Sequence, residues 1–184
     1  MEALFWKLAL SKCLYIANVY KCNMYVSNTS TLILLAKVGS SGLLLDDIKE
    51  IIIPKVVYDE IHGKESFELK LIDKEIKSDR IKVGNIDKKH YESIIRQFKL
   101  DDGEAAAYAL FKEKNGKVLL TDDGELIKLC KIENIPFIVA MAVVVMLAKK
   151  DKIIRAEALE KLSKLYGYGR YSEEIYKYFK SEVK

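Results

Sequence analysis

Five short runs of apolar, mostly β-branched residues recur along the chain from residue 24 onward, and stretches with helical spacing separate them. Runs of this length and composition predict buried strands. They are Met24–Val26, Ile51–Ile53, Ile81–Val83, Val118–Leu120 and Phe137–Val139. Strands that alternate with helices form parallel sheets covered on both faces, so the pattern predicts an α/β fold around a central parallel sheet.

The stretches between these runs predict six helices, and the C-terminal part of the chain predicts three more. Pro54 suits the first turn of a helix because its missing N–H has no helical partner there. The six helices are Ser30–Lys37, Pro54–His62, Phe67–Ile76, Asp87–Phe98, Gly103–Lys114 and Gly124–Ile132. The three C-terminal helices lie around Ala142–Lys149, Arg155–Leu165 and Glu173–Glu182.

The length of 184 residues suits one domain, which we expect over residues 24–184. Residues 1–23 carry apolar runs, but Lys7 and Lys12 interrupt them and no small-residue cleavage site follows, unlike a signal peptide. They are either a helical N-terminal extension or a mis-assigned start. The longest apolar run, Phe137–Ala148, is shorter than the roughly 20 residues of a membrane span, so we expect no membrane contact. Three cysteines favour a reducing, cytoplasmic location.

Polar and acidic side chains follow several of the predicted strands. Asn28 comes directly after the first strand, and Thr121, Asp122 and Asp123 come directly after the fourth. Glu60 lies in the helix after the second strand, and Glu104 lies near the start of the alanine-rich helix that leads into the fourth. In an open parallel sheet ligands bind outside the carboxyl ends of the strands. We therefore expect Asn28, Glu60, Glu104 and Asp123 to share one pocket there.

Carboxylates that converge in this way repel one another unless a cation neutralises them. Mg²⁺ or Mn²⁺ is the natural choice for oxygen ligands, and the chemistry that these ions serve is usually hydrolysis at phosphorus. The sequence has no phosphate-binding glycine loop and no GxSxG motif, and His62 and His90 are isolated. Each aspartate alone is more often a helix cap than a ligand, so only the joint pattern favours a metal site.

Four stretches in order resemble the motifs of PIN-domain proteins. The first is closest to a prokaryotic branch in which V-S-N-T-S replaces V-D-T-S. The resemblance covers roughly residues 24–183. The four stretches are Tyr25–Lys37, Ile53–Ile61, Leu100–Ala105 and Leu120–Asp123.

The resemblance implies a three-layer α/β/α sandwich, often dimeric, and an Mg²⁺- or Mn²⁺-dependent ribonuclease, commonly the toxin that an antitoxin protein controls. It maps the acidic positions of the family to Glu60, Glu104 and Asp123. The first acidic position is Asn28 here, which removes one negative charge from the pocket. An amide oxygen still binds a hard cation, but more weakly than a carboxylate does.

The first hypothesis is thus a metal-dependent ribonuclease in which Glu60, Glu104 and Asp123 bind the metal, with help from Asn28 and Asp122, and Thr121 orients a metal-bound water. The C-terminal segment has ten basic and six acidic residues from residue 149 onward. We expect this basic excess to lie beside the pocket and to contact the phosphates of RNA. The candidates for these contacts are Lys149, Lys150, Lys152 and Arg155.

Two alternatives remain open. The first is a PIN-like module that has lost turnover and binds RNA or a protein partner, which Asn28 favours. The second is a phosphoacceptor receiver, which also has paired aspartates at a strand end. A receiver needs a further aspartate and a lysine at other strand ends, whereas Ile53 is followed by Pro54 and Val139 by Ala140, so we rank it lowest.

Overall fold

The computed structural model describes residues 24–48, 50–62, 64–168 and 170–183, so the predicted N-terminal extension 1–23 lies outside it. Its five strands form one parallel sheet in the order β3-β2-β1-β4-β5. Each strand is short, and β1, β2, β4 and β5 are buried along their whole length. The strands are β1 (Tyr25–Ser27), β2 (Ile51–Pro54), β3 (Ile81–Gly84), β4 (Val118–Leu120) and β5 (Phe137–Ile138).

Ten helices occur in the described part of the chain. Side chains cap the N-termini of several of them, among them Asn28, Ser66, Asp87, Asp123 and Ser172. The helices are α2 (Thr29–Lys37), α3 (Ser41–Asp47), α4 (Lys55–His62), α5 (Phe67–Lys77), α6 (Lys88–Gln97), α7 (Asp102–Glu113), α8 (Gly124–Ile132), α9 (Ala140–Lys149), α10 (Arg155–Gly167) and α11 (Glu173–Glu182).

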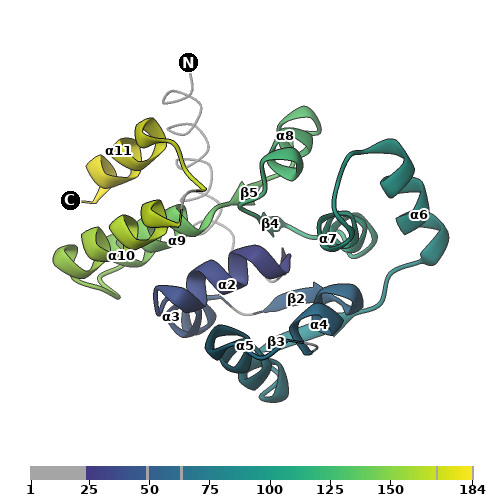
Figure 1. Ribbon diagram of the computed structural model, residues 1–184, viewed down its shortest axis with the longest axis horizontal. Coiled ribbons are helices and arrows are strands. Elements are labelled where there is room, and N and C mark those ends of the chain that lie inside the picture. The colour runs from purple at the N-terminus through teal and green to yellow at the C-terminus, as the bar shows by residue number, and fades with distance from the viewer. Residues whose placement is uncertain (1–23, 49, 63, 169, 184) are drawn as a thin grey trace.

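The sheet lies between two helical layers, with α2 and α9 on one side and α7 on the other (Figure 1). The three-layer α/β/α sandwich is thereby confirmed. Ala105, Ala106 and Ala107 are fully buried in α7, and their small side chains allow this helix to pack closely on the central strands β1, β2 and β4. The helix α4 contacts both α2 and α7, so it joins the two layers. None of the helices in the described ranges is long and apolar enough to cross a bilayer.

The structure shifts several predicted helix starts by one residue, and one of these shifts corrects the role of Pro54. Pro54 ends β2 instead of beginning α4, which starts at Lys55. The register explains why a proline is accepted here. The pairing of β1 with β2 stops at Ile52, while β3 continues to pair with β2 as far as Pro54 opposite Gly84. At Pro54 the strand therefore lacks a partner on the β1 side, where its missing N–H removes no ladder bond.

The sequence patterns did not predict α3. Its capping position, Ser40, makes no side-chain capping bond, and Ser41 and Gly42 are weak helix formers. The helix is instead held by packing, because Leu44 and Leu45 are buried.

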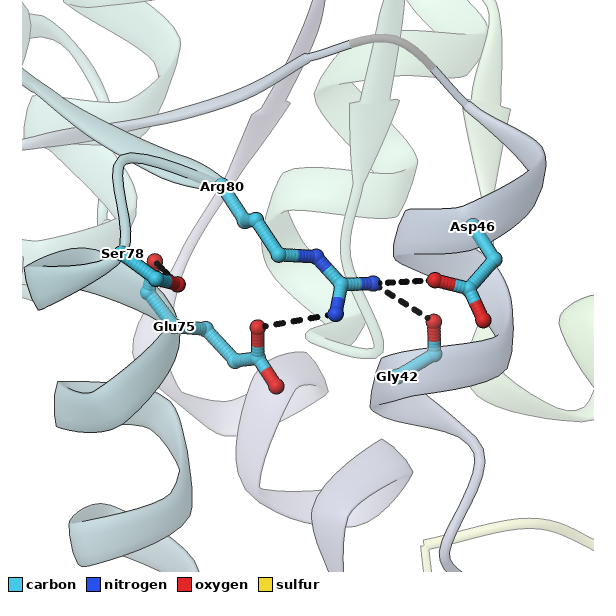
Figure 2. Close-up of polar contacts among 5 residues, drawn as sticks. All are labelled: Gly42, Asp46, Glu75, Ser78 and Arg80. Atoms are coloured by element: carbon cyan, nitrogen blue, oxygen red, sulfur yellow. Dashed lines mark hydrogen bonds and ion pairs between the residues drawn. The ribbon is translucent and has the colours of Figure 1, made fainter.

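A distant arginine also holds α3 in place. The Nη2 atom of Arg80 donates to the carbonyl of Gly42 at 3.0 Å and to Oδ1 of Asp46 at 2.6 Å (Figure 2). Its Nη1 atom lies 3.4 Å from Oε2 of Glu75 near the end of α5, where Ser78 Oγ donates to the Glu75 carbonyl. Long-range contacts of this kind leave no local signal in the sequence.

Candidate active site

An open pocket of about 660 Å³ lies at the carboxyl edge of the sheet. It brings together four of the predicted site residues, Asn28, Glu60, Glu104 and Asp123, all of which line its wall. They come from the N-terminus of α2, from α4, from the first turn of α7 and from the N-terminus of α8. The two helical layers therefore contribute to one site.

Asn28 is both a helix cap and a pocket residue. Its backbone is extended, and its Oδ1 accepts hydrogen bonds from the backbone N–H of Thr31 at 3.4 Å and from Ser30 Oγ at 3.2 Å. Only 3% of the residue is exposed. Asparagine and aspartate cap helices about equally well, so capping alone does not explain the amide at this position.

Glu60 is held by neighbours from both layers. Thr29 Oγ1 donates to its Oε2 at 2.6 Å. A Cβ atom on Gly103 would lie 3.0 Å from Oε1 of Glu60, which is closer than nearly all real Cβ contacts. Gly103 therefore provides the space that the Glu60 carboxylate occupies beside the first turn of α7.

Glu104 and Asp123 form a carboxylate pair in the pocket. Glu104 Oε2 accepts from the backbone N–H of Asp101 at 3.1 Å, and Asp123 Oδ1 accepts from the N–H of Leu126 at 2.8 Å. Burial raises the pKa of Glu104 to about 7, and the nearby charge of Asp123 and a hydrogen bond between the two carboxyls add to the rise. Without a cation, the pair thus tends to hold a proton near neutral pH.

Asp122 and Thr121 do not line the pocket, which corrects their expected places beside the metal. Asp122 is buried, where both its oxygens accept from the N–H of Ala140 at 3.1 Å and Oδ1 also accepts from the Tyr171 hydroxyl. Burial raises its pKa, whereas the bonds from Tyr171 and Ala140 favour the charged form. Thr121 Oγ1 accepts from the N–H of Asp123 at 3.1 Å. Both residues therefore position their neighbours.

The structure also does not bring the four predicted RNA-binding residues to the pocket. Lys149 is paired with Glu182 and Lys150 with Asp47, each at 2.6 Å. Lys152 and Arg155 are exposed next to the start of α10 and do not line the pocket either. The geometry of α9 explains this, since ten residues that begin at the carboxyl edge carry the chain about 15 Å toward the opposite edge.

Other cations line the pocket instead, namely Lys37, Lys64 and Arg170, together with Tyr168. The position of Lys37 has a local signal in the sequence. Ser30, Ile33, Leu34 and Lys37 line the pocket at the spacing of one helical face. Tyr168 and Arg170 lie far along the chain, and only the tertiary fold brings them here.

The donor set of the pocket suits a hard cation. In the described ranges no group of three Asp, Glu, His or Cys side chains comes together tightly enough to hold one ion. Mg²⁺, however, usually binds to one or two carboxylates and keeps several waters. The Glu104–Asp123 pair meets that need, with the Asn28 amide and the Glu60 carboxylate in the same pocket.

Comparison with known proteins gives one match. A family model described as a PIN domain matches residues 24–184. Neither the curated proteins nor the solved structures gave a match. The family model spans most of the chain, and the three-layer fold agrees with it. The chain therefore belongs to the PIN-domain family.

Proposed function

We propose that the pocket at the carboxyl edge hydrolyses phosphodiester bonds in RNA with the help of Mg²⁺ or Mn²⁺. Membership of the PIN-domain family supports a nuclease, because the fold is of the nuclease type. The observation that carries the proposal is the Glu104–Asp123 pair. Burial raises the pKa of Glu104 to about 7 with a contribution from the charge of Asp123, and a bound cation would offset both the burial cost and the repulsion between the two carboxylates.

The residues of the pocket have separate tasks in this proposal. Glu104 and Asp123 hold the ion, and the Asn28 amide oxygen adds a neutral ligand. Thr29 donates a hydrogen bond to the Glu60 carboxylate and holds it in place, and Glu60 orients the attacking water. A bound divalent ion lowers the pKa of a water and stabilises the charge that develops at phosphorus.

Cations of the pocket bind the substrate in the same proposal. Lys64 and Arg170 line the pocket together with the carboxylates, so they are placed to contact phosphates that flank the scissile bond. The pocket thus combines carboxylates for the metal with cations for the RNA backbone.

A second candidate is a PIN-like module that binds RNA or a protein partner without turnover. Asn28 favours it, because an amide in place of the first carboxylate weakens the attraction for a cation. A toxin role under the control of an antitoxin, and a homodimer, remain predictions from the family resemblance.

Cleavage of a fluorescently labelled single-stranded RNA tests the proposal. Mn²⁺ or Mg²⁺ should start cleavage and EDTA should stop it. Asp123→Asn and Glu104→Gln should reduce the rate to the level seen with EDTA, since Asn still caps α8 and Gln still accepts from Asp101. Glu174→Gln is the matched control, because Glu174 is an exposed first-turn glutamate of α11.

Two results would contradict the proposal. Cleavage that persists in a Glu104→Gln, Asp123→Asn double variant would refute the metal-site mechanism. Binding of RNA by the natural protein with no metal-dependent cleavage would favour the module without turnover.

A further inference from the structure

We propose that Tyr168, together with Lys37 and Arg170, forms a platform that receives an unpaired base of the RNA at the mouth of the pocket. The inference rests on the proposed function and deepens it, because it names the residues of this chain that bind a base of the substrate. Tyr168 supplies a surface for stacking. The two cations bind the phosphates on either side of the base.

Tyr168 is unusual among the aromatic residues of the described chain. It is 42% exposed, and it lines the same pocket as the carboxylates. The Nζ atom of Lys37 lies 4.7 Å from the centre of its ring. The contact with Lys37 gives the ring a cationic neighbour, which suits a site for a base attached to a phosphate backbone.

The platform is anchored to the acidic side of the pocket. Tyr168 is the C-cap residue that follows α10, and Arg170 and Tyr171 precede α11. Tyr171 is buried, and its hydroxyl donates to Asp122, the neighbour of the pocket residue Asp123. The charge of Arg170 also acts on the Asp122 carboxyl, because it is one of the groups that lower the pKa of Asp122. The C-terminal segment and the acidic pair are therefore positioned by the same buried bond.

The cations that line the pocket have no carboxylate partner among the described residues and can bind the phosphates of a ligand. Within the described part of the chain, the side chains of Lys37, Lys64 and Arg170 form no ion pair with a carboxylate, in contrast to Lys149 and Lys150. An exposed ring among unpaired cations recognises nucleotides through base stacking and phosphate contacts. A base in a duplex is already stacked on its neighbours, so this geometry favours a single strand.

Binding measured in EDTA tests the platform without any need for cleavage. Two labelled probes of equal length are compared, an eight-nucleotide single-stranded RNA and an abasic ribose-phosphate chain. Tyr168→Ala should weaken binding of the RNA about tenfold to a hundredfold and leave binding of the abasic chain unchanged. Tyr168→Phe should bind the RNA as the natural protein does, since it keeps the ring.

Two further variants complete the design. Phe67→Ala removes another exposed aromatic ring, which is 73% exposed outside the pocket, and should change neither affinity. Arg170→Gln should weaken binding of both probes and reduce the salt dependence, because a phosphate contact is lost in each case.

Three outcomes would overturn the platform. The first is that Tyr168→Ala binds the RNA as tightly as the natural protein does, and the second is that Tyr168→Ala loses affinity for both probes. The third is that the natural protein does not bind single-stranded RNA at all. Its failure is distinguishable from failure of the proposed function. If the natural protein cleaves RNA in a metal-dependent way and Tyr168→Ala keeps the full RNA affinity, only the proposed platform is refuted. If the variants bind the two probes as predicted but the natural protein shows no metal-dependent cleavage, only the proposed hydrolysis is refuted.

Discussion

Replacing Glu104 with Gln should stabilise the metal-free protein above pH 7, because the variant no longer buries a charged carboxylate there and has one carboxylate fewer beside Asp123. The pKa of Glu104 is raised from 4.5 to about 7 by folding. Between these values the folded protein holds more protons than the unfolded chain, so its stability falls as the pH rises. The penalty is absent below pH 4.5 and fully present above about pH 7.

The size of the effect follows from the linkage between protonation and folding. A carboxyl whose pKa rises from 4.5 to about 7 would cost about 3 kcal/mol if the whole shift were transmitted to stability. Glu104 is only half-buried, so water reduces both the burial cost and the repulsion from Asp123. We therefore expect Glu104→Gln to gain about 1–2 kcal/mol at pH 8, and nothing at pH 4.

Urea unfolding in EDTA at pH 4, 6 and 8 measures this difference. Glutamine preserves the hydrogen bond from Asp101, so the capping of α7 is unchanged. The exposed Glu174→Gln variant controls for the loss of a first-turn charge and should be neutral or slightly destabilising at every pH. A Glu104→Gln variant that is less stable than the natural protein at pH 8, or whose gain does not grow with pH, would refute the argument that burial and repulsion penalise the charged Glu104 carboxylate.

Three other substitutions separate the tasks of the pocket. Asn28→Asp should tighten Mn²⁺ binding in calorimetry and lower the melting temperature in EDTA, since a further carboxylate joins the site; unchanged affinity would show that Asn28 lies outside the metal site. Gly103→Ala should slow RNA cleavage with only a small change in melting temperature, because the added methyl displaces Glu60; full activity would contradict this steric argument. Tyr171→Phe should destabilise the protein in urea by about 1–3 kcal/mol, since it removes the hydroxyl bond to buried Asp122, and a neutral effect would show that this bond is dispensable.

Much of the fold could be predicted from the sequence because its signals are local. The apolar β-branched runs mark the five strands, and a parallel sheet follows from their alternation with helices. The meeting of Asn28, Glu60, Glu104 and Asp123 was predictable for the same reason, since each follows or flanks a strand of one parallel sheet.

Features that depend on contacts between distant segments could not be predicted in this way. The basic residues after Ala148 suggested an RNA surface, but the direction of α9 carries Lys149 and Lys150 away from the pocket, where Glu182 and Asp47 pair with them. The sequence likewise led us to expect both Asp122 and Asp123 beside the metal. Their separation into a buried anchor and a pocket residue depends on where β4 ends and on the position of Tyr171.

Anomalous scattering from a crystal of the protein soaked in Mn²⁺ tests the central claim most directly. We predict a manganese peak at the carboxyl edge of the sheet, within bonding distance of Glu104 and Asp123, that disappears in the Glu104→Gln, Asp123→Asn double variant. A fully occupied peak elsewhere, or no peak in this pocket at saturating Mn²⁺, would contradict the metal site and the hydrolysis that we propose for it.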